Sequence, residues 1–159
     1  MAGRLIGIAR REKPRAPMEE LESAIITREA GLEGDSKGVK FPKRQITLLE
    51  RELWEAALFV LGNPDLAWTA RRANLLVEGV HLPRGAGSEL LVGAVRLEVT
   101  AQTSPCARMD EIWPGLRRAL APDWRGGVTC RVVKGGIIRL GDVVEVLREI
   151  TPPKVHLPG

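Results

Sequence analysis

Alternation of apolar and polar residues with a period of two marks several short strands in this chain. Every second residue of segment 95–100 is apolar, as a half-buried strand requires, and segment 128–132 alternates in the same way. Gly135-Gly136 and Gly141-Asp142 then separate short apolar segments, which is typical of strands joined by tight turns. The remaining strand candidates are segments 4–9, 24–27, 45–49, 74–77, 137–140 and 143–147.

Helical periodicity is confined to two regions. Segment 50–61 repeats apolar residues at helical spacing and is followed by Gly-Asn-Pro, which ends a helix. A second helix is expected to begin with Ser104 as its N-cap and Pro105 at its first position. Its apolar face would contain Met109, Ile112 and Trp113. Pro114-Gly115 breaks this helix, and a short continuation is expected over residues 116–120.

These elements favour a mainly β (α+β) fold, in the form of a closed or nearly closed β-barrel with two or three short helices. The length of 159 residues fits one domain, and 44% hydrophobic with 28% charged residues is typical of a globular protein. We expect a single domain over residues 1–150 and a loose C-terminal tail over 151–159. No apolar run approaches the roughly 20 residues that cross a membrane, and the N-terminus does not read as a signal peptide. We therefore predict a cytoplasmic protein with no membrane partner.

Charge and cysteine content exclude several classes of protein. The net charge of +4, from 24 basic and 20 acidic residues, permits an anionic partner without demanding one. Two cysteines are too few for a disulfide scaffold or a four-ligand zinc site, and His81 and His156 lie at no metal-ligand spacing from them. With two histidines, no Ser-His-Asp set is credible, and the chain contains no dinucleotide-binding fingerprint.

The two cysteines have different expected roles. Cys106, at the second position of the expected helix, would lie at the positive end of the helix dipole, where a thiolate is stabilised and becomes a nucleophile or a soft metal ligand. Arg108 would add to that effect. The alternative is that Cys106 is a small buried residue, and the local pattern does not choose between the two. Cys130 alternates with valines on one strand face and is expected in the core.

Two basic segments are candidate oxyanion sites. The turn Gly31-Leu32-Glu33-Gly34-Asp35 leads into a segment that contains Lys37 and Arg44, and glycines allow a ligand to approach the backbone closely. Arg71-Arg72 forms a second basic pair just before the strand that begins near Asn74. A solvated basic loop is the alternative interpretation of both. Nucleic acid is the less favoured partner: with no Tyr and only two Phe, base stacking would have to rely on the four Trp residues.

In serial order, these segments resemble the MOSC family, which is named for the C-terminal domain of molybdenum cofactor sulfurases. The resemblance extends over roughly residues 20–148 and includes the Gly-Asp turn at 31–35 with the strand at 44–49. Residues 72–79, with Ala73 inserted, resemble the family segment RRNLLVEG, and residues 97–106 resemble the strand that leads to the family's hallmark cysteine. Arg125-Gly126-Gly127 and the segments after it resemble the closing strands. One departure is that the family often has a histidine shortly after the Gly-Asp turn, where this chain has Ser36 and Lys37.

The resemblance implies a small stand-alone MOSC-type β-barrel that binds a pterin-type molybdenum cofactor. Cys106 would be the catalytic residue, either as a sulfur carrier or as a ligand of molybdenum. Lys37, Arg44, Arg71 and Arg72 are candidate partners for the cofactor phosphate and pterin oxygens, because fixed cations suit oxyanions. Asn74 is a candidate for amide hydrogen bonds to the pterin edge. Pyridoxal phosphate is not expected, because the aminotransferase-like half of full sulfurases is lacking.

Three functions remain open at this point. The first is a molybdenum-dependent oxidoreductase or sulfur transferase, for which some family members suggest reduction of N-hydroxylated compounds. The second is a non-catalytic carrier or chaperone that delivers the cofactor, with molybdoenzyme apoproteins or a sulfur donor protein as partners. The third, motivated only by the mild basicity, is a small nucleic-acid-binding barrel. The sequence gives neither the physiological substrate nor the oligomeric state.

Overall fold

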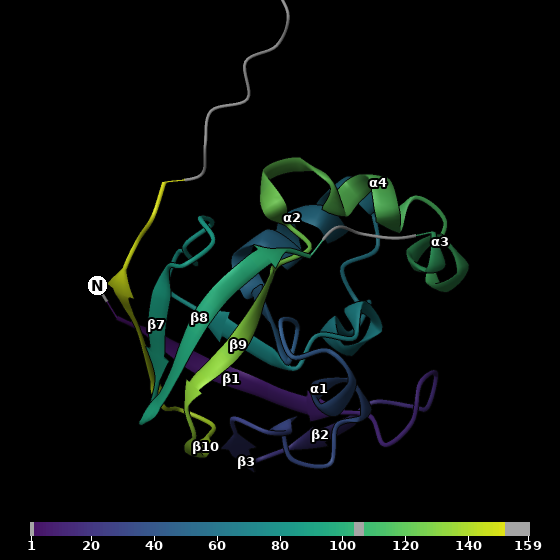
Figure 1. The fold of residues 1–159 in the computed structure, drawn as a ribbon. Helices are drawn as coiled ribbons and strands as arrows, with labels where there is room; N and C mark the ends of the chain where they lie inside the picture. Colours follow the sequence, from purple (N-terminus) through teal and green to yellow (C-terminus); the bar gives the residue numbers. More distant parts are fainter. Residues whose placement is uncertain (1, 104–106, 152–159) are drawn as a thin grey trace, which may run out of the picture.

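The computed structural model describes residues 2–103 and 107–151, and its centre is a closed barrel of seven strands (Figure 1). Following the barrel wall, the strands come in the order β11, β7, β8, β9, β5, β6 and β1, and β1 pairs back to β11 through Gly3 with Val144. Their bounds are Gly3–Arg10 (β1), Ile46–Glu50 (β5), Leu75–Glu78 (β6), Glu89–Val92 (β7), Val95–Gln102 (β8), Val128–Lys134 (β9) and Val143–Arg148 (β11). Closure leaves the barrel with no open sheet edge between β1 and β11. The predicted fold class is confirmed.

Alternating side chains fill the barrel. In β8, the residues Val95, Leu97 and Val99 are buried while Arg96 is exposed, so the period of two seen in the sequence separates core from solvent. All neighbouring barrel strands are antiparallel except β5 and β6, which are parallel. The core is built mainly from Leu, Ile and Val, together with Cys130.

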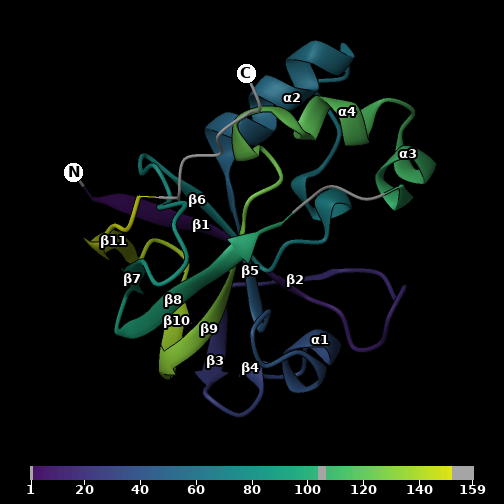
Figure 2. The same ribbon diagram turned by 45° about the horizontal axis from the view of Figure 1, so that its top comes forward.

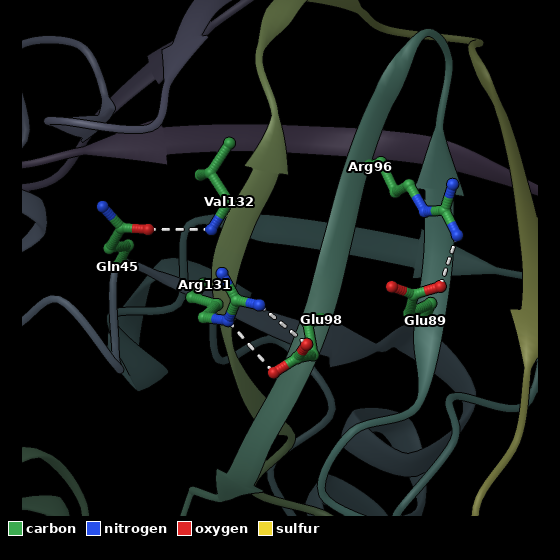
Figure 3. Close-up of polar contacts among 6 residues, drawn as sticks. All are labelled: Gln45, Glu89, Arg96, Glu98, Arg131 and Val132. Atoms are coloured by element: carbon green, nitrogen blue, oxygen red, sulfur yellow. Dashed lines mark hydrogen bonds and ion pairs between the residues drawn. The ribbon is translucent and has the colours of Figure 1, made fainter.

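A smaller sheet of β10 (Gly136–Arg139), β3 (Ser23–Thr27) and β4 (Gly31–Leu32) lies against the barrel, and β2 (Glu19–Leu21) pairs with the C-terminal half of β1. Gln45 ties the two sheets together: its Nε2 donates to the Arg28 carbonyl at 2.7 Å, and its Oε1 accepts from the Val132 amide at 2.8 Å (Figure 3). Because Gln45 is buried, both ends of its amide need such partners.

Ion pairs lie on the outer surface of the barrel. Arg131 on β9 donates two hydrogen bonds to Glu98 on β8, at 3.0 and 2.9 Å, and Arg96 pairs with Glu89 on β7 (Figure 3). The hydrogen bond from Arg131 lowers the pKa of the Glu98 carboxyl. Since these side chains are partly exposed, each pair contributes at most about 1 kcal/mol.

Four short α-helices are present in the described residues, and three of them lie together at one end of the barrel. These are α2 (Arg51–Leu61), α3 (Arg108–Ile112) and α4 (Leu116–Leu120), whereas α1 (Ser36–Lys40) lies apart from them, beside the small sheet (Figures 1 and 2). Two 3₁₀ helices, η1 (Trp68–Arg71) and η2 (Pro122–Trp124), complete the set. Helices α2 and α4 bury a second apolar cluster that includes Trp54, Leu58 and Leu116. Among the described residues, no helix is a candidate for crossing a membrane.

The helices differ from the sequence prediction in two respects. Helix α1 was not expected, because its five residues, SKGVK, show no apolar periodicity. The predicted apolar face of Met109, Ile112 and Trp113 is wrong: Met109 is buried, but Ile112 and Trp113 are 37% and 41% exposed. Helix α3 ends at Ile112, and Trp113 follows in an extended conformation, so the three side chains do not share one helix face. The expected helix start at Ser104 and the tail over 152–159 lie outside the described residues.

Candidate functional site

A cleft of about 510 Å³ is lined by residues of α1 and α3 together with residues of the barrel strands β5 and β9. Figure 2 shows these helices on the same side of the molecule, with the loop after β1 extending toward that side as well. A volume of this size holds a drug-sized ligand or a cofactor. The lining residues are Arg11, Arg15, Lys37, Phe41, Arg44, Thr47, Arg71, Arg72, Thr103, Arg108, Met109, Glu111, Ile112 and Thr129.

The charge of this lining is strongly one-sided. Seven of the residues are Lys or Arg, and Glu111 is the one carboxylate among them. Within the described part of the chain, no ion pair involves Arg11, Arg15, Lys37, Arg44, Arg72 or Arg108. The charge of Asp35 offsets the mutual repulsion of these cations only in part, at Lys37 and Arg72, and an anion in the cleft would relieve the remainder. The net charge of +4 does not predict that basic side chains gather in one cleft.

Lys37 is positioned by the way α1 packs on the chain before it. Its neighbour Gly38 lies so close to Ala30 that a Cβ added there would be 1.9 Å from the Ala30 carbonyl oxygen, so only glycine fits. The Lys37 Nζ donates a hydrogen bond to the Thr47 Oγ1 at 2.5 Å, which fixes the ammonium against the end of the barrel. Burial, together with nearby arginines, lowers the pKa of Lys37 to about 8, although Asp35 opposes the shift. Lys37 is therefore the cation of the cleft that is nearest to losing its proton at neutral pH.

Arg71 and Arg72 are held by backbone carbonyls. Arg71 is 7% exposed, and its guanidinium donates to the carbonyls of Gly126 and Thr103 at 3.1 and 3.4 Å. Arg72 adopts a left-handed backbone conformation with φ 64°, and its guanidinium donates to the Ala16 carbonyl. Neutral carbonyl acceptors fix the position of each guanidinium without removing its positive charge, so both side chains can still attract an anion.

Arg44 and Phe41 form the rim of the cleft next to α1. The Arg44 guanidinium lies 4.8 Å from the centre of the Phe41 ring, within cation–π distance, and Phe41 is 43% exposed. A planar guanidinium stacked on an aromatic ring is also a surface on which a flat heterocycle can stack. This pair adds to the cations a feature that suits the ring system of a ligand.

Hydroxyl groups provide further polar atoms in the cleft. The Thr129 Oγ1 lies 2.8 Å from the Thr100 Oγ1 and so belongs to a hydrogen-bonded network between β8 and β9. The Thr103 Oγ1 is buried and, within the described residues, has no hydrogen-bond partner. A buried hydroxyl without a partner costs about 1–3 kcal/mol, and a ligand oxygen or nitrogen in the cleft could satisfy it.

Asn74 does not line the cleft with the other predicted residues. It is 1% exposed, its Oδ1 accepts from the Thr47 amide at 2.9 Å, and its Nδ2 donates to the Ala9 carbonyl at 3.2 Å. Both ends of the side-chain amide are therefore engaged with the backbone of β5 and β1, the strands on either side of β6. We assign Asn74 a structural role in joining β1 to β5, in place of the contact with the pterin edge expected from the sequence.

The structure brings Lys37, Arg44, Arg71 and Arg72 together in one cleft. Cys106 lies outside the described residues, so its expected convergence with them stays a prediction. Arg11 and Arg15 were missed, although the basic segment RREKPR directly after the first strand was a signal that could have found them. Arg108 had been considered only as an aid to the Cys106 thiolate.

The expectation that Cys130 lies in the core is confirmed. Cys130 has no exposed surface, and burial strongly raises the pKa of its thiol, which makes it unreactive at neutral pH. Within the described residues, no three His, Cys, Asp or Glu side chains form a group that could hold a metal ion.

Comparison with known proteins agrees with this fold. The model of the MOSC domain family matches residues 35–145, which is more than half of the chain. Among solved structures, the chain is similar to the YuaD protein from Bacillus subtilis, with 19% identity and a TM-score of 0.78 over 92% of this chain and 96% of that one. It is also similar to YiiM from Escherichia coli, with 18% identity and a TM-score of 0.70 over 93% and 71% of the two chains. YiiM from Geobacillus stearothermophilus gives 16% identity and a TM-score of 0.71 over 92% and 75%.

At these identities the solved structures establish the fold alone. No curated protein sequence matches the chain. The family model, by contrast, covers the segment from Asp35 through the first half of β11, which contains α1, the strands that border the cleft, and Cys106. Together with the closed seven-stranded barrel, this match shows that the chain belongs to the MOSC domain family.

Proposed function

We propose that the chain binds a pterin-type molybdenum cofactor in the cationic cleft. The observation that carries the proposal is the gathering of seven basic side chains around one cleft with a single carboxylate in its lining. The phosphate and the pterin oxygens of the cofactor are oxyanion and carbonyl acceptors, and guanidinium and ammonium donors are their natural partners. The described residues therefore fit the anionic part of the cofactor.

Each part of the cleft has a distinct role in this proposal. Lys37, Arg71 and Arg72 would hold the phosphate and pterin oxygens, and Arg44 with Phe41 would stack against the ring system. Cys106 would ligate molybdenum or carry sulfur, because a thiolate is a soft ligand and a good nucleophile. When bound, the cofactor would supply two-electron redox chemistry, which is the chemistry that reduction of an N-hydroxylated compound requires.

The test is the cofactor content of protein produced in a host that makes molybdenum cofactor. We expect about one molybdenum per wild-type chain by elemental mass spectrometry, and one pterin per chain by fluorescence after oxidative release. Lys37→Met combined with Arg44→Gln should reduce both contents at least tenfold, since a charge-assisted hydrogen bond contributes about 1.5–3 kcal/mol and the stacking surface of Arg44 is lost as well. Arg118→Gln is the matched control, because Arg118 is an exposed arginine that does not line the cleft.

The cysteines supply a second pair of variants. Cys106→Ser should lose molybdenum or persulfide sulfur, whereas Cys130→Ala should retain both. Wild-type protein without pterin or molybdenum, from a host that loads a known molybdoenzyme, would overturn the proposal. If the cofactor is retained through turnover of an N-hydroxylated compound, the chain is a reductase. If it is released to an apoenzyme without turnover, the chain is a carrier.

A further inference from the structure

Lys37 is the one lysine in the described lining of the cleft, and the other basic side chains there are arginines. A guanidinium keeps its proton in proteins, so it binds anions but does not act as a nucleophile. A lysine amine attacks carbonyl carbons once it has lost its proton. Among the described residues, the cleft therefore combines several permanent cations with a single amine that is capable of covalent chemistry.

A hydroxyl group fixes the position of this amine. The Lys37 Nζ lies 2.5 Å from the Thr47 Oγ1 on β5, and Thr47 is the cross-strand neighbour of Thr129 on β9. All three residues line the cleft, so the amine is held beside the space that a ligand would fill. A hydroxyl accepts a hydrogen bond from an ammonium and donates one to a neutral amine. Thr47 can therefore hold Lys37 in both protonation states, whereas a carboxylate partner would favour the ammonium alone.

The charges near Lys37 act in both directions. Asp35 favours the ammonium, but within the described residues it forms no ion pair with Lys37, and its Oδ1 accepts from the Arg11 amide at 3.0 Å. Burial has the largest effect on the pKa of Lys37, and it outweighs Asp35 together with the charges of Arg11, Arg71 and Arg44, so that the pKa is about 8. At pH 7 about one chain in ten then has a neutral amine, on the order of a hundredfold more than for a lysine of ordinary pKa.

The arginines determine which carbonyl compounds would reach this amine. Arg11, Arg44 and Arg71 line the same cleft as Lys37, and their charges act on it. A guanidinium binds a carboxylate or a phosphate through two parallel hydrogen bonds, which also orient the bound group. A compound with an anionic group next to its carbonyl would therefore be concentrated beside the amine, whereas an uncharged aldehyde would not.

We propose that Lys37 forms an imine with anionic carbonyl compounds that bind to the arginines of the cleft. The Nζ lone pair attacks the carbonyl carbon, and the carbonyl oxygen takes up a proton as the C=O double bond opens. Loss of this oxygen as water leaves a C=N double bond. Both protons of the neutral amine depart in that water, so the step needs neither an oxidant nor a reductant. The inference goes beyond the proposed function, because holding the oxygens of a cofactor requires no covalent chemistry of Lys37.

Reductive trapping on the full chain, produced in a host that lacks molybdenum cofactor, tests this proposal. Glyoxylate and sodium cyanoborohydride are added at pH 7, and hydride from the cyanoborohydride converts an imine at any lysine into a stable carboxymethylated amine. Peptide mass spectrometry then gives the rate at each lysine. Lys40 is the internal reference, because it lies on the same helix, is exposed and does not line the cleft. We expect Lys37 to react at least tenfold faster than Lys40, in keeping with its larger neutral fraction.

Three further measurements test the role of the arginines. With acetaldehyde, which has a methyl group in place of the carboxylate, the ratio of the Lys37 rate to the Lys40 rate should fall at least threefold. Pyrophosphate binds guanidinium groups but forms no imine, so it should slow the reaction of Lys37 with glyoxylate and leave that of Lys40 unchanged. Arg44→Gln should reduce the Lys37 rate with glyoxylate more than with acetaldehyde. Arg118→Gln, at an exposed position outside the cleft lining, should change neither rate.

Equal rates at Lys37 and Lys40 would overturn the imine site, and an undiminished rate ratio with acetaldehyde would overturn the part assigned to the arginines. Both comparisons are made on wild-type protein, so they do not depend on whether a variant folds. Cofactor bound by a chain whose Lys37 is unreactive would refute this inference alone. A reactive Lys37 in a chain that never retains molybdenum or pterin would refute the proposed function alone.

Discussion

Replacing Asn74 with alanine separates a structural role of this residue from a role in ligand binding. The side chain joins two barrel strands, since its Oδ1 accepts from the Thr47 amide on β5 and its Nδ2 donates to the Ala9 carbonyl on β1. The backbone of Asn74 makes two further hydrogen bonds, to the Thr47 carbonyl and from the Ala9 amide, and these remain in the variant. Asn74→Ala therefore removes two side-chain hydrogen bonds and leaves one buried donor and one buried acceptor unsatisfied.

The magnitude follows from the cost of those two groups. Each unsatisfied buried group costs about 1–3 kcal/mol, so the free energy of unfolding should fall by about 2–6 kcal/mol. For a domain of this length, each kcal/mol lowers the melting temperature by about 2–4 °C. Asn74→Asp provides a matched variant. One oxygen of its carboxylate can still accept the hydrogen bond from the Thr47 amide, but the other faces the Ala9 carbonyl oxygen, and two acceptors cannot form a hydrogen bond with each other. Protonation of this buried carboxyl restores a donor, so Asn74→Asp should recover part of the lost stability as the pH falls.

The assay is urea denaturation followed by circular dichroism, combined with pyrophosphate titration of the folded variants. We expect Asn74→Ala to lose stability by the stated amount while its pyrophosphate affinity stays within twofold of wild type. Unchanged stability with a tenfold loss of pyrophosphate affinity would show that Asn74 contacts the ligand and would refute the structural assignment.

Four further predictions concern the cleft and the core. Affinity for sulfate, whose charge does not change between pH 7 and 9, should fall as Lys37 loses its proton near pH 8, and Lys37→Arg should remove this dependence; equal pH profiles for the two proteins would contradict it. The pKa of Lys37 is about 8 in the folded protein and about 10.4 in the unfolded chain, so between pH 8 and about 10.4 the unfolded chain binds more protons. The free energy of unfolding of the wild type should therefore rise with pH over this range. The Lys37→Met variant should not show that rise. Gly38→Ala should cost about 1–3 kcal/mol in unfolding free energy and should weaken sulfate binding, because the added Cβ would meet the Ala30 carbonyl and displace α1 with Lys37; sulfate binding at the wild-type level would show that α1 does not set the position of Lys37. Iodoacetamide should label Cys106 much faster than Cys130, and Cys130→Ser should cost roughly 1–3 kcal/mol with no change in anion binding; faster labelling of Cys130 would overturn the assignment of the two thiols.

The local patterns of the sequence determined most of the barrel. Strands such as β8 and β9 can be predicted from the sequence because burial on one face imposes alternation of apolar and polar residues, and that signal is contained within seven or eight residues. Helix α2 can be predicted for the same reason, because its buried face repeats apolar residues at helical spacing. The five residues of α1 lack such a signal, because this helix is held by its packing on Ala30 and not by an apolar stripe.

The cleft was only partly predictable because it is assembled from segments far apart in the chain. Basic residues next to glycine turns suggested Lys37, Arg44, Arg71 and Arg72, and the barrel brings these four together.

The sequence could not show that Arg11 and Arg15 join them, since the path of the loop after β1 depends on tertiary packing. The sequence also could not show that Arg72 and Asn74, two positions apart, have different roles. Tertiary structure decided that the first lines the cleft while the second is buried between strands, because the backbone conformation at Arg72 and the pairing of β1, β5 and β6 direct their side chains to different places.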